Sequence, residues 1–279
     1  MARRLLSNAN RCPRERQVQT QDLWQRSVLL LAVIVVAALA PQGCGNRDTG
    51  TLYREAMDAA ANAQWTQARS LTGKILAVED ENLEARILHG LSLYELQEVE
   101  EAVTMLGQAA QSAPNSFVAQ YFYGWALFET SAYADALRPL KKAYEIRKDH
   151  PDLLILLATC CLEQNLQEGL RYLQALRRFK PYRDDAKVYN DMALLWLGKP
   201  DRERAKELLL RAHAKDPDNP VILQNLAVLH DQYLRDYPQA VRYYRLCLRA
   251  SRRRRDNTRE AKVSQRLREI VAEMRHAGS

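Results

Sequence analysis

The residue types that carry most enzyme chemistry are scattered along this chain. The five histidines, His89, His150, His213, His230 and His276, never lie three or four residues apart, and no Cys-x-x-Cys or His-Glu-x-x-His segment occurs. A metal site on a helix needs such spacings, because only side chains about one turn apart can reach the same ion. The sequence therefore predicts no metal site and no cofactor.

Nucleophiles and acid–base pairs are equally unsupported. Cys160 and Cys161 are adjacent and so point to different sides of a helix, and Asp184 and Asp185 are neighbours rather than a facing pair. General acid–base catalysis needs two groups that converge on one substrate. No glycine-rich loop follows a strand, since no segment has the pattern of a strand. We therefore expect a protein without catalytic activity.

The positive charge of the chain is concentrated at its two ends. The 279 residues carry a formal net charge of +7. Residues 1–26 hold six basic and two acidic residues, and residues 251–279 hold nine basic and four acidic ones, so the remainder has a net charge of −2. A body without basic surplus cannot follow a phosphate backbone. We therefore expect no nucleic acid as a partner.

An apolar segment near the N-terminus predicts export or membrane anchoring. Fourteen residues from Ser27 to Ala40 carry no charge, and six arginines precede them. As a helix they would span roughly 21 Å, less than the roughly 30 Å of a bilayer core. An arginine-rich flank stays on the cytoplasmic side. Everything after residue 45 is therefore expected to face away from the cytoplasm.

Cys44 gives this segment a resemblance to a bacterial lipoprotein signal. Gly43 precedes the cysteine as such signals require, whereas Pro41 and Gln42 depart from their pattern. Three alternatives remain: lipidation of Cys44, an uncleaved anchor or other export signal, and a buried core helix. In the first two, residues 1–44 form the export signal or anchor. The resulting expectation is a membrane-anchored protein of the bacterial cell envelope, with the following domain in the periplasm.

Small residues return along the chain at a nearly constant period. Intervals of 34, 34, 34, 35 and 34 residues separate Ala56, Gly90, Gly124, Ala158, Ala193 and Ala227. A second small residue follows each of these after eleven to thirteen positions: Ala68, Ala102, Ala136, Gly169, Ala205 and Ala240. Facing small residues let two helices cross closely. Such a pair cannot bury its apolar side alone, but stacked pairs can.

The best copy of the pattern resembles the tetratricopeptide repeat (TPR) family. It runs from Leu83 to Ser116 and matches the family through Gly90, Leu93, Ala102, Leu106, Ala109 and Pro114. The resemblance implies an all-α, right-handed superhelical solenoid of about six helix pairs. The expected repeats are residues 49–82, 83–116, 117–150, 151–183, 186–219 and 220–254. An amphipathic segment, residues 257–275, is expected to cap the last repeat.

The family resemblance also implies where partners bind. One face of each first helix lines the groove, and the candidate residues there are Tyr53, Ile87, Leu91, Tyr94, Tyr121, Trp125, Phe128 and Asn190. Tyr121, Trp125 and Phe128 follow each other at i, i+4 and i+7, so they form one stripe. The stripe has two interpretations, an aromatic partner surface or packing against neighbouring helices. The expected occupant is a protein or peptide, as an amphipathic helix or an extended apolar segment.

A basic patch formed by Arg252, Arg253, Arg254 and Arg255 is the strongest charge run. These arginines either complement the C-terminal dipole of the preceding helix or contact an anionic lipid or acidic partner. The leading functional expectation is a tethered scaffold or adaptor, which by resemblance assists the assembly of an envelope machine such as a secretion system, pilus or outer-membrane complex. The alternatives are a factor associated with peptidoglycan or another glycan and, less favoured, a nucleic-acid binder that uses the basic patch.

Overall fold

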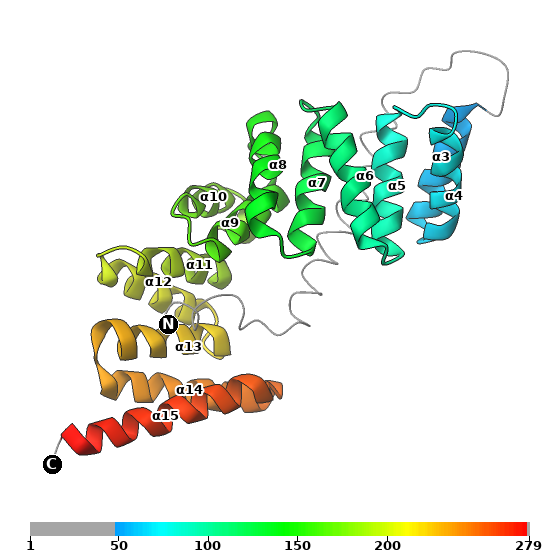
Figure 1. The fold of residues 1–279 in the computed structure, drawn as a ribbon. Helices are drawn as coiled ribbons and strands as arrows, with labels where there is room; N and C mark the ends of the chain where they lie inside the picture. The colour runs from blue at the N-terminus through cyan, green and yellow to red at the C-terminus, as the bar shows by residue number, and fades with distance from the viewer. Residues whose placement is uncertain (1–47, 278–279) are drawn as a thin grey trace. The chain divides into compact units, whose positions relative to one another are not determined.

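The computed structural model describes residues 48–277, and within this range it contains helices and turns and no strand (Figure 1). The expected all-α class is therefore confirmed. The expected export signal or anchor, residues 1–44 with Cys44, lies outside the described residues. None of the helices between residues 48 and 277 combines the length and the apolar character needed to cross a bilayer.

The described chain divides into two compact units, residues 48–160 and 161–277. The first unit contains α3 (Thr49–Ala61), α4 (Trp65–Leu76), α5 (Leu83–Glu95), α6 (Val99–Ser112), α7 (Phe117–Glu129), α8 (Tyr133–Ile146) and the start of α9 (Pro151–Glu163). The second unit contains α10 (Gly169–Leu176), a 3₁₀ turn (Lys180–Tyr182), α11 (Ala186–Leu197), α12 (Arg202–Lys215), α13 (Pro220–Val228), a π-helix (Leu229–Leu234), α14 (Tyr237–Arg254) and α15 (Asn257–Ala277).

Short polar side chains define where many of these helices begin. The Asn82 side chain accepts a hydrogen bond from the backbone N–H of Ala85 at 2.9 Å, and Asp185 does the same for Val188 at 3.0 Å. Such caps satisfy N–H groups that have no partner inside the first helical turn. Helices such as α5 and α11 therefore start at a residue that the local sequence specifies, whereas α4, α6, α8 and α10 have no side-chain cap.

The turn inside each of the first four pairs has the same backbone conformation. Ala63, Gln97, Ser131 and Asn165 lie 34 residues apart, and all have a positive φ between 53° and 66°. Next to Gln97, the N–H of Glu98 bonds the carbonyl of Leu93 at 2.9 Å, and equivalent bonds occur in the other three turns. This left-handed ending satisfies carbonyls that the last helical turn leaves open. It also reverses the chain so that the second helix packs on the first.

The recurring small residues lie where paired helices cross. Ala56, Ala102 and Ala136 are completely buried. At Gly124 the approach is closer still, because a Cβ atom there would lie 2.6 Å from Cγ of Leu140. No side chain fits at that distance, so the period of small residues records the places where two helix backbones approach most closely.

Two pairs depart from the regular period, and the structure shows how. The interval between the two small residues is twelve residues in the pair that starts at Gly90, eleven after Ala158 and thirteen after Ala227. The shorter interval coincides with α10, which has only eight residues. The longer interval coincides with the π-helix after α13, because a π turn takes up an additional residue without ending the helix.

Candidate functional site

The first helices form one side of the unit of residues 48–160. Helix α3 contacts α5, and α5 contacts α7, whereas the second helices α4, α6 and α8 have fewer contacts with one another. Closer contact among the first helices makes them the inner side of this unit's stack. The inner side of a repeat stack is the surface that such proteins offer to partners.

Three of the expected groove residues on α3 and α5 are buried. Tyr53 is 6 % exposed, Ile87 2 % and Leu91 1 %. The Tyr53 hydroxyl has no hydrogen-bond partner within the described part of the chain. Burial and, to a smaller extent, the charge of Glu84 raise the pKa of Tyr53 above its ordinary value. The hydroxyl therefore stays protonated and keeps an unused hydrogen-bond donor.

The aromatic stripe on α7 packs against rings from other elements. Tyr121 is 3 % exposed, and its ring centroid lies 5.3 Å from that of His150. Trp125 is 4 % exposed and makes an edge contact with Tyr94 at 4.5 Å between centroids. The packing interpretation therefore describes the contacts of both side chains in this structure. A role for either one in partner binding stays a prediction.

Tyr94 and Phe128 keep part of their surface exposed. They occupy equivalent positions 34 residues apart, on α5 and α7, and both are half-buried. The Phe128 ring makes an edge contact with Tyr133 at 5.3 Å, while the Tyr94 hydroxyl donates to Oε2 of Glu129 at 3.2 Å. Of the expected groove residues in this unit, these two have accessible surface to offer a partner.

A desolvated carboxyl group lies beside this pair of aromatics. Burial raises the pKa of Glu129 to about 7, although hydrogen bonds from Tyr94 and Trp125 act in the opposite direction. Burial also raises the pKa of Glu95, whose charge adds to the effect on Glu129. The inner side of the α5–α7 region therefore combines aromatic surface with acids that resist ionisation.

Asn190 belongs to the other unit and takes part in a buried polar cluster. Its Oδ1 accepts a hydrogen bond from Asn225 at 2.7 Å, and its Nδ2 donates to Asp191 at 3.2 Å. Lys187 pairs with Asp191 at 3.5 Å. Asn190 is 4 % exposed, so its amide joins α11 to α13 in this structure.

The basic patch is exposed and partly paired. Arg252 lies 2.6 Å from Glu260, and Arg253 lies 3.1 Å from Asp218. Arg255 has a positive φ of 55° and ends α14. The run therefore stands at the C-terminus of a helix, where positive charge complements the helix dipole. No ion pair is present for Arg254 or Arg255 between residues 48 and 277.

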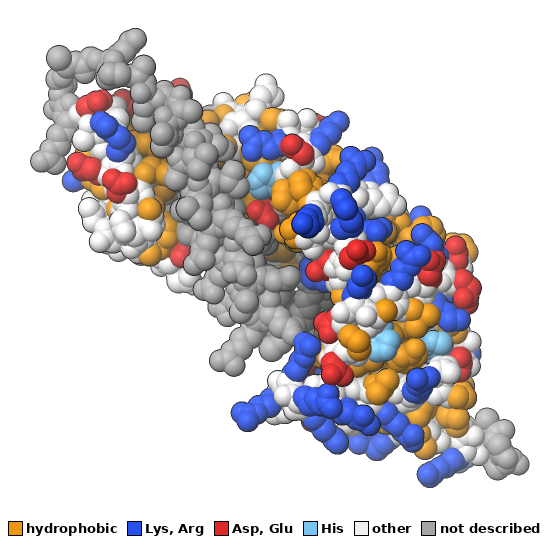
Figure 2. Space-filling view, turned by 180° about the vertical axis from the view of Figure 1, so that it is seen from behind, with side chains coloured by type: hydrophobic (Ala, Val, Ile, Leu, Met, Phe, Trp, Pro, Cys, Tyr) orange, Lys and Arg blue, Asp and Glu red, His pale blue; other side chains and the backbone are white. Residues whose placement is uncertain are grey.

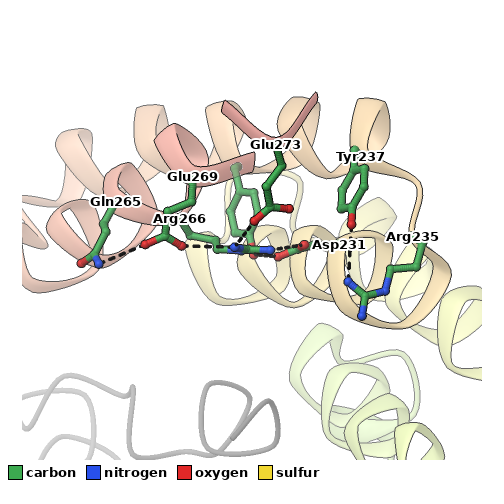
Figure 3. Close-up of polar contacts among 8 residues, drawn as sticks. Asp231, Arg235, Tyr237, Gln265, Arg266, Glu269 and Glu273 are labelled. Carbon is green, nitrogen blue, oxygen red and sulfur yellow. Dashed lines mark hydrogen bonds and ion pairs between the residues drawn. The ribbon is translucent and has the colours of Figure 1, made fainter. Parts of the chain in front are cut away.

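The sequence did not predict the ion pair that joins α15 to the π-helix. Asp231, in the π-helix, is fully buried and receives two bonds of 2.8 Å from the guanidinium of Arg266 on α15 (Figure 3). Tyr244 donates to the same carboxylate at 3.1 Å, and Glu269 and Glu273 approach Arg266 from its own helix. The only sequence signal was an acidic residue within the largely apolar residues 226–234.

The scattered histidines and cysteines do not come together. No group of three potential metal ligands occurs within residues 48–277. Cys160, Cys161 and Cys247 are buried, and burial raises the pKa of the Cys247 thiol to about 11. A protonated, inaccessible thiol is a poor nucleophile.

Comparison with protein families identifies two matching regions. A tetratricopeptide-repeat family model matches residues 53–117, and a family model described as anaphase-promoting complex, cyclosome, subunit 3 matches residues 108–176. Both matches fall on the helix pairs that start with α3, α5, α7 and α9. No curated protein matches the chain as a relative.

Solved structures show the same fold at low sequence identity. YrrB, described as a TPR protein with an unusual peptide-binding site, is 16 % identical over 70 % of this chain and 97 % of its own, with a TM-score of 0.56. PilF of Pseudomonas aeruginosa is 16 % identical over 78 % of this chain and 97 % of its own, also at 0.56. The MamA protein is 18 % identical over 61 % and 92 %, at 0.53. These likenesses establish the helical-repeat fold.

Proposed function

This chain belongs to the tetratricopeptide-repeat family, and we propose that it is a non-catalytic scaffold or adaptor that binds a protein or peptide partner along its first helices. One observation carries the proposal. In the unit of residues 48–160, α3, α5 and α7 form the inner side of the stack, and the two expected groove residues that stay half-buried there, Tyr94 and Phe128, are aromatic. Rigid aromatic surface is the usual material of binding hot spots. The peptide-binding site described for YrrB supports the same class of partner.

The proposal extends to where the chain acts. The apolar residues 27–40 and Cys44 tether it to a bacterial membrane, with the repeats on the periplasmic side. There it assists the assembly of an envelope machine such as a secretion system, a pilus or an outer-membrane complex. A reporter enzyme that works only in the cytoplasm, fused after Ser279, tests the orientation. It should be inactive, and full activity would exclude a periplasmic domain.

Partner binding is tested on the two aromatic residues that remain accessible. Full-length chain carrying Tyr94→Ala and Phe128→Ala is compared with wild type in capture from solubilised membranes. The matched control replaces two exposed apolar residues of second helices, Ile146→Ala and Leu210→Ala, whose side chains are 47 % and 39 % exposed. Circular dichroism verifies that both variants keep their helices.

A genuine partner is retained by wild type and by the control but lost from the Tyr94/Phe128 variant. In a direct titration, the same partner must bind purified wild type and the control with similar affinity, and the Tyr94/Phe128 variant more weakly. Equal binding by all three chains would show that the first helices do not carry the interaction, and the proposal would be wrong.

A further inference from the structure

Helix α14 carries a row of arginines on its exposed side. Arg242, Arg245, Arg249, Arg252 and Arg253 recur at intervals of 3, 4, 3 and 1 residues, and all five are exposed. At 100° per residue they fall within about 100° of the helix circumference, in a row about 17 Å long. We call these five residues the arginine stripe. It extends the basic patch by nearly three helical turns.

The rest of α14 is fixed in the core. Ala240, Tyr244, Cys247 and Ser251 lie on the opposite side of the helix and are at most 2 % exposed. The first three pack in one cluster with residues of α13 and α15, such as Leu223 and Ile270. The arginine stripe therefore projects from a rigid helix. No apolar face of α14 is left to insert into the apolar interior of a membrane.

The charge of the stripe is poorly compensated. Helix α14 holds six arginines and no acidic residue. Arg242, Arg245 and Arg249 have no ion pair within residues 48–277, and the carboxylates that meet Arg252 and Arg253 come from outside α14. Figure 2 shows blue Lys and Arg side chains gathered on the part of this unit that carries α14 and α15.

Helix α12, another second helix of the same unit, shows the usual arrangement. Its Arg211 lies 2.6 Å from Glu207, which also pairs with Arg204, and its Lys206 lies 3.4 Å from Glu203. A solvated helix face needs no more than such alternating charges to stay soluble. The stripe repels itself, so solubility alone does not account for it.

We propose that the arginine stripe binds the phosphates of an anionic phospholipid surface. Arginine pairs with phosphate through two parallel N–H···O bonds, and a cluster of four to eight basic residues on one helix is typical of contact with acidic headgroups. This inference rests on the tether of the proposed function, which keeps the chain beside lipid and away from nucleic acid. Because the apolar face of α14 is occupied, the contact stays at headgroup level and is sensitive to salt.

The experiment uses the full chain in lipid nanodiscs made either of phosphatidylcholine alone or of phosphatidylcholine with about 40 % phosphatidylglycerol. Phenylglyoxal modifies accessible arginines, and mass spectrometry follows each one. In anionic discs, modification of Arg242, Arg245 and Arg249 should be about fivefold slower than in neutral discs, because about 1 kcal/mol of surface attraction per arginine corresponds to about a factor of five. High salt should abolish the difference. Arg204 and Arg211 on α12 are internal references whose rates should not change.

A pair of variants distinguishes binding by the arginine stripe from a nonspecific effect of positive charge. In Arg242→Gln/Arg245→Gln/Arg249→Gln, protection of the remaining Arg252 and Arg253 should disappear. The matched variant Arg204→Gln/Arg211→Gln should keep it. Equal rates in both kinds of disc, or protection that survives high salt, would overturn the proposal. Protection by a short DNA duplex without protection by anionic discs would overturn it in favour of nucleic acid.

The tether has a readout of its own in the same samples. Co-elution of the chain with neutral discs measures the anchor, whereas the difference between anionic and neutral discs measures the stripe. A chain that fails to co-elute with neutral discs but is protected on addition of anionic discs would refute the tether and support the stripe. A chain that co-elutes with both kinds of disc but shows no protection of the arginine stripe would support the tether and refute the proposal for the stripe.

Discussion

Glu129→Gln should stabilise the protein at high pH and leave its stability unchanged in acid. The carboxyl group of Glu129 is half-buried beside Tyr94 and Trp125, and burial raises its pKa from an ordinary 4.5 to about 7. A carboxyl group with a raised pKa in the folded state favours its protonated form there. Folding then carries no penalty below about pH 4.5, an increasing one up to about pH 7, and the full penalty above it.

The size of the effect follows from that interval. Moving a carboxyl pKa from 4.5 to about 7 corresponds to about 3 kcal/mol, and residual exposure of the group reduces this to about 1 to 3 kcal/mol. A glutamine of the same shape still accepts hydrogen bonds from Tyr94 and Trp125 but never ionises. The difference in unfolding free energy between Glu129→Gln and wild type should therefore rise from near zero at pH 4.5 to that value at pH 8.

Urea unfolding followed by circular dichroism, repeated at half-unit pH intervals, measures this difference. Glu145→Gln on α8 is the control, because Glu145 is exposed and should show no comparable dependence on pH. A pH-independent difference for Glu129→Gln, or a variant less stable than wild type at pH 8, would refute the argument from desolvation.

Four further substitutions test the fold. Arg266→Met leaves the carboxylate of Asp231 buried without its partner, so unfolding free energy should fall by about 3 to 5 kcal/mol and amide exchange in α15 should accelerate; an unchanged exchange rate would contradict the anchoring role. Gly124→Ala should lower the unfolding free energy by about 1 to 3 kcal/mol, because the new Cβ atom has no room. Gly73→Ala should raise it by up to about 1 kcal/mol, because the nearest atom would lie 3.7 Å from the new Cβ atom. Equal melting temperatures of the two variants would exclude the close helix crossing as the cause. Ser131→Gly should raise unfolding free energy by up to about 1 kcal/mol by relieving a left-handed backbone, and a loss in urea unfolding would show that the turn is unstrained.

The paired helices could be predicted from the sequence because their signal is local and repeated. Small residues such as Ala56 and Gly124 recur at the crossing points, and the all-α fold that they predict is confirmed. The backbone of a helix pair tolerates only small side chains where it crosses closely. A pattern of residue size therefore carries the geometry without any knowledge of distant contacts.

The environment of the candidate site was harder to predict because it depends on side chains from other helices. A helical wheel places Tyr121 and Trp125 on one stripe but cannot show that His150 and Tyr94 meet them. The ion pair between Asp231 and Arg266 joins residues 35 positions apart, and it forms on a π turn whose rotation no regular period predicts. Both features arise from packing between elements.

The recurring left-handed turns make the first four helix pairs structurally equivalent. Removing any 34 residues between two equivalent turn positions, for example from Ala63 to Gln97, rejoins backbone of the same conformation and keeps every later helix in register. An internal duplication of that length does the same. The π turn after α13 breaks this equivalence, because its additional residue serves the fastening of α15. The first four helix pairs are therefore equivalent to one another, whereas the pair formed by α13 and α14 is not.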